Sequence, residues 1–175
     1  ALSILSARGG ERIALLGSNA LPCSGQLALR RILTAIENNQ APVASLPCLQ
    51  NLSKNSRLVM IGDFLSPLNQ IEDVIVHFAS LGVCGHLIQV LDPAEEFLPY
   101  DGRILFSDIE GEGEVRISHV ESMRNEYQAE LENHRFGINE ICRRFAWGFI
   151  SHRTDQVPEH ALSALCSQLS ANPKA

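Results

Sequence analysis

Two hydrophobic periods alternate along this chain. Short runs in which nearly every residue is apolar are typical of buried strands, whereas apolar residues three and four positions apart are typical of one helix face. The strand-type runs lie near residues 12–17, 57–62, 86–91 and 147–151. Because helix-type segments separate them, we expect right-handed crossovers and a mainly parallel sheet with helices on both faces. The pattern therefore predicts an α/β fold.

A β-hairpin is expected to interrupt this alternation near residues 103–118. Residues 104–106 and 115–117 are short strand-like runs on either side of two Glu-Gly pairs, which favour a turn. A long amphipathic helix is expected to follow, and Pro158 is expected to open the last helix.

Length and composition are those of an ordinary globular protein. The chain has 175 residues, of which 45% are hydrophobic and 19% charged, so we predict a single domain over residues 1–175. Residues 41–56, with two prolines and several serines and asparagines, are the best loop or linker candidate. The net charge of -6 argues against a nucleic-acid partner. No apolar run is long enough to span a membrane.

Five scattered cysteines show neither metal-finger spacing nor a Cys-x-x-Cys motif. We therefore expect reduced, mostly buried thiols and a cytoplasmic location. The phosphate-binding glycine motifs, His-Glu-x-x-His and Gly-x-Ser-x-Gly are all missing as well. Because no nucleophile–base or cofactor motif is found, we expect a binding module rather than an enzyme.

Carboxylates are the one suggestive chemical group. Asp63, Asp92 and Asp155 each follow a predicted strand, and parallel strands end at the same rim of a sheet. With Glu95 and Glu96 beyond Asp92, this rim would be rich in oxygen ligands, which suit Mg²⁺. The alternative role is helix capping. Capping is favoured for Asp155, and both roles stay open for Asp63.

Three motifs resemble a known family. Asp-Pro-Ala-Glu-Glu at 92–96 follows a strand, Pro-Tyr-Asp-Gly-Arg at 99–103 precedes the hairpin, and Thr-Asp-x-x-Pro-Glu-x-Ala-Leu at 154–162 opens the last helix. In this order they are similar to the bacterial family called domain of unknown function 58, a divergent branch of the von Willebrand factor A-like fold. The resemblance runs over nearly the whole chain and is densest from Leu58 to Leu169.

The resemblance implies a particular metal site. The von Willebrand A-like fold commonly carries a metal-ion-dependent adhesion site, built from Asp-x-Ser-x-Ser after the first strand, a Thr in a second loop and an Asp after a later strand. Asp63 matches the last of these, and Ser24 or Ser18 would stand in for the Thr. Asp-x-Ser-x-Ser is absent, so we expect the N-terminal part with the first strand to be missing before Ala1. We therefore expect an incomplete site at Asp63 and Ser24 that binds Mg²⁺ weakly.

Members of this family are often encoded beside MoxR-type AAA+ ATPases. The resemblance thus implies a protein-interaction or adaptor module that works with such an ATPase. The alternative is a metal-assisted hydrolase that uses Asp63 and Asp92. A missing first strand would leave the strands at 12–16 and 58–62 with open edges, so we also expect a homodimer or larger assembly.

Overall fold

A computed structural model describes residues 1–18, 20–38, 45–100, 104–107, 114–117 and 120–171. The chain forms two compact units, Ala1–Gln50 and Asn51–Ala175. Their boundary falls inside the segment 41–56 that was expected to be a loop or linker. The single domain over residues 1–175 stays a prediction, because compactness alone does not tell whether two units fold independently.

The first unit contains two helices, α1 (Leu2–Arg8) and α2 (Gly25–Glu37). The chain leaves α1 through Gly9 and Gly10, and the φ of +79° at Gly10 is one that glycine adopts without strain. Ala28 and Ile32 are the buried residues of α2.

The strand predicted at residues 12–17 is wrong. Ile13 makes one isolated antiparallel bridge with Cys23, and the Arg12 guanidinium donates to the Pro22 carbonyl at 2.9 and 3.1 Å. No ladder of strand hydrogen bonds continues from this bridge in the described part of the chain. An apolar run indicates burial, but a strand also needs a neighbour along its length, which the run itself does not encode.

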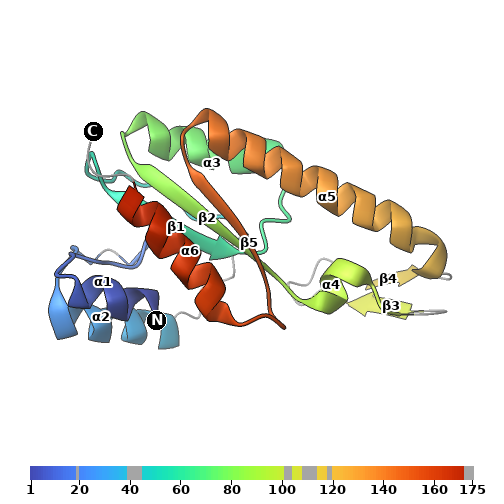
Figure 1. The fold of residues 1–175 in the computed structure, drawn as a ribbon, viewed down its shortest axis with the longest axis horizontal. Helices are drawn as coiled ribbons and strands as arrows, with labels where there is room; N and C mark the ends of the chain where they lie inside the picture. The colour runs from blue at the N-terminus through green and yellow to red at the C-terminus, as the bar shows by residue number, and fades with distance from the viewer. Residues whose placement is uncertain (19, 39–44, 101–103, 108–113, 118–119, 172–175) are drawn as a thin grey trace. The chain divides into compact units, whose positions relative to one another are not determined.

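A parallel three-stranded sheet forms the centre of the second unit (Figure 1). Its strand order is β1-β2-β5, so each of the other three predicted strands is confirmed. The strands are β1 (Arg57–Gly62), β2 (Cys84–Leu91) and β5 (Gly148–Arg153), and the helices around them are α3 (Leu68–Ser80), α5 (Val120–Arg144) and α6 (Pro158–Ala171).

Helices cover both faces of this sheet, as predicted. The Gln89 side chain of β2 bonds to α5, whereas the His86 side chain of the same strand bonds to Gln168 of α6 at 3.1 Å. Since successive side chains of a strand point to opposite faces, α5 and α6 lie on opposite sides of the sheet. Helix α3 packs beside α5. The core therefore lies between the sheet and its helices, where Leu87 and Phe78 are fully buried.

A close approach between β2 and Trp147 tightens this core. A Cβ atom placed on Gly85 would lie 2.1 Å from the Trp147 ring, so the ring packs directly on the strand backbone. The indole is 5% exposed. Only glycine leaves room for it at this point of β2.

The β-hairpin is confirmed, and a short helix precedes it. Strands β3 (Ile104–Ser107) and β4 (Glu114–Ile117) pair antiparallel, while the predicted turn between them lies outside the described residues. Helix α4 (Pro93–Phe97) was not predicted.

Two sequence-based expectations concern the thiols and the membrane. All five cysteines are free, but only Cys142 is buried, so the expectation of mostly buried thiols is wrong. Cys48 lies on a loop, and Cys84 is the first residue of β2, so both thiols lie outside the core. Within the described ranges, none of the helices combines the length and the apolar character that a membrane crossing requires.

Candidate functional site

The carboxyl ends of the three parallel strands meet at one rim of the sheet. Asp63 directly follows β1, Asp92 follows β2, and Asp155 lies two residues after the end of β5. The predicted position of these acids is therefore correct. Their interactions decide what the rim can do.

Asp92 caps helix α4. Its carboxylate accepts the Ala94 N–H at 2.9 Å, and the Glu95 carboxylate in turn accepts the Asp92 N–H at 2.8 Å, which completes a capping box. The Thr154 hydroxyl donates to the second oxygen of Asp92 at 2.8 Å. The Ala94 N–H, followed by the Thr154 hydroxyl, lowers the pKa of Asp92 below its ordinary value.

Asp155 pairs with Arg153 and does not cap a helix, so the favoured capping role is wrong. The guanidinium donates through Nε and Nη2 to the two carboxylate oxygens of Asp155, at 2.7 and 3.1 Å. Helix α6 begins only at Pro158, whereas Arg153 is the last residue of β5, two positions before Asp155. The Arg153 hydrogen bond lowers the pKa of Asp155. Arg153 also lies over the Phe97 ring, 5.0 Å from its centroid.

A buried polar chain links the ends of the strands. The Gln89 side chain is 0% exposed; its amide donates to the Asp63 carbonyl at 2.8 Å and its oxygen accepts the Arg135 Nε–H at 3.0 Å. Arg135 also pairs with Glu96 at 2.5 Å, and Glu96 lies 3.6 Å from Arg153. This polar chain of hydrogen bonds and ion pairs therefore connects β1, β2, α5, α4 and β5. It fixes the ends of the three strands relative to one another.

Sequence reasoning missed Gln89 and Arg135. A signal was present for Gln89, because a lone polar residue inside the apolar run 87–91 needs a buried hydrogen-bond partner. The partner itself lies 46 residues away on α5, where nothing in the local pattern distinguishes Arg135 from a surface arginine. The capping box at Asp92 was also readable, from its Asp-Pro-x-Glu sequence.

Asp63 is exposed. Its backbone carbonyl belongs to the polar chain, but its carboxylate does not. Its carboxylate accepts the Leu65 N–H at 3.4 Å, and α3 begins only at Leu68, so Asp63 does not cap that helix. The next residue, Phe64, has a φ of +50°, and its carbonyl is bonded to His134 Nε2 at 2.7 Å. His134 thus has a structural role, holding the loop after β1 against α5.

The described residues of the rim are not arranged as a ready magnesium site. Among the residues that the structure describes, no three His, Cys, Asp or Glu side chains are placed to hold a metal ion together. The Asp92 and Asp155 oxygens already accept hydrogen bonds, which leaves Asp63 as the one rim aspartate without a side-chain donor among the interactions described here. Ser24 is the N-cap residue of α2 in the other unit and makes no side-chain cap hydrogen bond. Weak binding at Asp63 and Ser24 stays a prediction.

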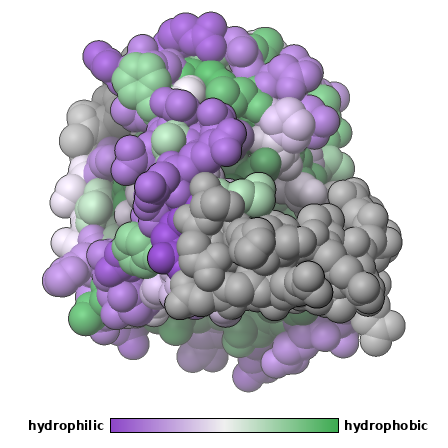
Figure 2. Space-filling view, turned by 90° about the vertical axis from the view of Figure 1, so that its right-hand side faces the viewer, coloured by the Kyte–Doolittle hydropathy of each residue, from purple (hydrophilic) through white to green (hydrophobic). Residues whose placement is uncertain are grey.

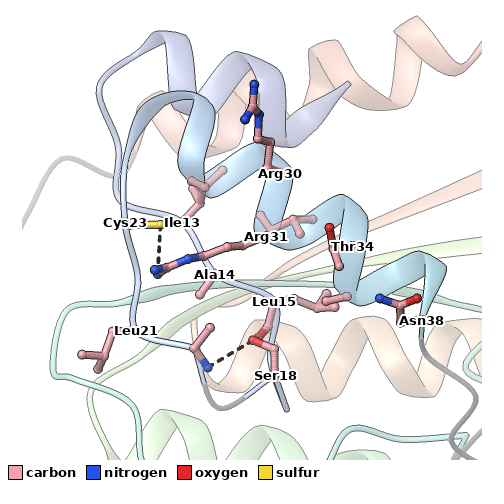
Figure 3. A pocket seen from close by; sticks show the side chains of 14 residues that line it. Ile13, Ala14, Leu15, Ser18, Leu21, Cys23, Arg30, Arg31, Thr34 and Asn38 are labelled. Atoms are coloured by element: carbon pink, nitrogen blue, oxygen red, sulfur yellow. Dashed lines mark hydrogen bonds between the residues drawn. The ribbon is translucent and has the colours of Figure 1, made fainter.

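The first unit has a pocket of about 420 Å³ (Figure 3). Ser18, one of the two serines expected to stand in for the Thr of an adhesion site, lines it. The Arg31 guanidinium reaches across it to lie 3.7 Å from Cys23 Sγ. The Ser18 hydroxyl donates to the Leu15 carbonyl at 2.7 Å. Ser18 therefore serves the local turn, and its oxygen is engaged within its own loop.

Comparison with known proteins gives one match. The model of the family described as protein of unknown function DUF58 matches residues 1–137 of this chain. No curated protein and no solved structure matches it.

Proposed function

The chain belongs to the DUF58 family of unknown function, and we propose that it is a protein-interaction module that acts as an adaptor for a MoxR-type AAA+ ATPase. The frequent encoding of family members beside such ATPases supports this partner. The proposal includes a von Willebrand A-like arrangement of the parallel sheet and a cytoplasmic location.

The observation that carries the proposal is a rigid rim with exposed apolar side chains. Leu65, Phe97 and Tyr100 are 45%, 43% and 39% exposed. Arg124 donates to the carbonyls of Leu98 and Tyr100 at 3.0 and 2.9 Å, which fixes the backbone around Phe97 and Tyr100, and the 2.7 Å contact of His134 with the Phe64 carbonyl fixes the backbone beside Leu65. Large apolar side chains on a preorganised backbone are the usual energetic centres of protein interfaces.

Part of the second unit's surface is largely polar. Outside the grey atoms, Figure 2 shows mostly hydrophilic residues, with separate hydrophobic ones between them, on the side that carries α4 and the start of α5. A few apolar anchors within a polar surface suit a partner that binds and leaves.

The test is a binding measurement with the purified MoxR-type ATPase encoded beside this protein. We expect saturable binding by biolayer interferometry, weakened about tenfold by Leu65→Ala or Phe97→Ala, as for moderate interface hot spots. Val76→Ala is the matched control, because Val76 is 41% exposed but lies within α3. Absence of binding, or equal loss in all three variants, would overturn the adaptor proposal.

An enzymatic outcome would also replace it. Mg²⁺-dependent turnover of a panel of esters and phosphoesters, abolished by Asp63→Asn, would show the metal-assisted hydrolase instead. The turnover of Asp92→Asn is measured beside that of Asp63→Asn, because Asp92 is the other carboxylate that the hydrolase was expected to use.

Self-association through β1 is part of the same proposal. Among the described strands β1 pairs with β2 on one side only, and its Ile61 is 62% exposed. An edge strand without proline, lysine or a bulge invites pairing with a second copy. Light scattering at micromolar concentration should therefore show a dimer that Ile61→Lys converts to monomer. A wild-type monomer would refute this part alone.

A further inference from the structure

A groove runs beside the rim, between the loop after β1 and helix α5. Its volume is about 430 Å³. Its lining residues are Leu65, Leu68, Tyr127, Glu130, Leu131, Asn133 and His134. All belong to the second unit, and none is part of the polar chain that links the strand ends.

The walls of this groove are held in place without a ligand. His134 fixes the loop through its 2.7 Å contact with the Phe64 carbonyl. On the other side, a Cβ atom on Gly137 would lie 2.5 Å from Leu68, so Leu68 already packs on the α5 backbone. Leu131 at the base is 6% exposed. Because the groove is preorganised, a ligand would not have to order it.

The groove is apolar inside and acidic at its edge. Tyr127, Glu130 and His134 lie three and four positions apart on α5, so they form one stripe along the groove. Glu126 and Glu130 are exposed on neighbouring turns of the same helix.

The nearby arginines of α5 hydrogen-bond to groups other than the groove-lining residues, and they keep their positive charge. Arg124 bonds to the carbonyls of Leu98 and Tyr100, and Arg135 bonds to Gln89 and Glu96. Both guanidinium groups are directed to those acceptors. Among the residues that line the groove, Glu130 is the acidic side chain that a cation of a partner can meet.

We propose that this groove binds a partner segment in which a leucine-sized side chain lies next to a lysine or arginine. The apolar side chain fills the space between Leu65, Leu68 and Tyr127, and the cation pairs with Glu130. The inference rests on the proposed function as an interaction module and adds the chemistry of the partner. Charge complementarity selects a basic segment over an acidic one.

Fluorescence polarisation with two labelled helical peptides tests this directly. The peptides carry the same leucines, and lysines in one are replaced by glutamates in the other. We expect the basic peptide to bind more tightly, and Glu130→Lys to weaken it roughly three- to tenfold and to improve binding of the acidic peptide. Such a charge exchange would not follow from a merely structural role of Glu130.

Glu132→Lys is the matched control, because Glu132 is also exposed on α5 but does not line the groove. Equal binding of the two peptides to the wild-type protein, or the same loss in both variants, would overturn the inference. If the peptides behave as expected but the ATPase does not bind, the groove stands and the adaptor proposal fails. If the ATPase binds and Glu130→Lys changes neither interaction, only the groove is refuted.

Discussion

Replacing Gln89 with leucine should destabilise the second unit by breaking the polar chain at its buried centre. The Gln89 amide satisfies the Asp63 carbonyl and the Arg135 Nε–H at 2.8 and 3.0 Å, and the side chain is 0% exposed. Leucine has a similar volume, so the change removes hydrogen bonds without leaving a large cavity.

The magnitude follows from what is left unpaired. A buried group without its partner costs about 1–3 kcal/mol, and a hydrogen bond to a charged group is worth about 1.5–3 kcal/mol. Arg135 keeps Glu96 as a partner, and its side chain is 21% exposed, so water compensates for part of the loss. We therefore expect a decrease of roughly 2–4 kcal/mol in the free energy of unfolding.

Urea denaturation followed by tryptophan fluorescence measures this decrease. Trp147 is the sole tryptophan in the sequence and is 5% exposed in the second unit, so it reports on the unit that changes. Gln70→Leu on the exposed surface of α3 is the control, and it should change the free energy by no more than about 0.5 kcal/mol.

A double-mutant cycle with Arg135→Met separates the pair from the rest. If Gln89 and Arg135 act together, the two losses should fall short of additivity by about 1–2 kcal/mol. Additive losses would show that the two side chains stabilise the protein independently. A loss in Gln89→Leu no larger than that in the control would refute the buried chain itself.

Three further expectations rest on individual side chains. Gly85→Ala should lower the unfolding free energy by about 3 kcal/mol, because its Cβ would lie 2.1 Å from the Trp147 ring; unchanged urea stability would contradict that packing. Burial lowers the pKa of His86 below 6.5, so its contribution to stability is present above pH 6.5 and is lost as the pH falls through the lowered value. The free energy of unfolding, measured against pH, should therefore fall less steeply toward acid in His86→Gln than in the wild type. The same pH dependence in both proteins would contradict this. Burial raises the pKa of Cys142 to about 12, so iodoacetamide at pH 8 (about half a unit below an ordinary thiol pKa) should label exposed Cys84 and spare Cys142 by mass spectrometry; equal labelling would disprove the burial.

Local pattern was sufficient for most of the second unit's elements. The runs at 57–62, 86–91 and 147–151 became strands, and the last helix begins at Pro158. These predictions succeed because hydrophobic period and helix-starting residues are properties of neighbouring residues. The segment 12–17 failed for the opposite reason, since its strand depended on a neighbour that its own residues do not specify.

The hydrophobic pattern and the motifs were sufficient to predict the α/β class, the parallel strands and the family. The sequence also placed three aspartates at the ends of their strands. What it left undecided is the set of long-range contacts that these acids make, because those donors lie far away in the chain: Thr154 is 62 residues from Asp92, and Arg135 is 39 residues from Glu96.

Only the tertiary structure brought those donors to the rim and turned an oxygen-rich edge into a network of caps and ion pairs. A carboxylate in isolation is equally suited to a metal ion, a helix N-terminus or a guanidinium, and its role is set by which of them packing places within hydrogen-bond distance. The same packing opened the groove beside Leu65, which no periodicity along the chain predicts.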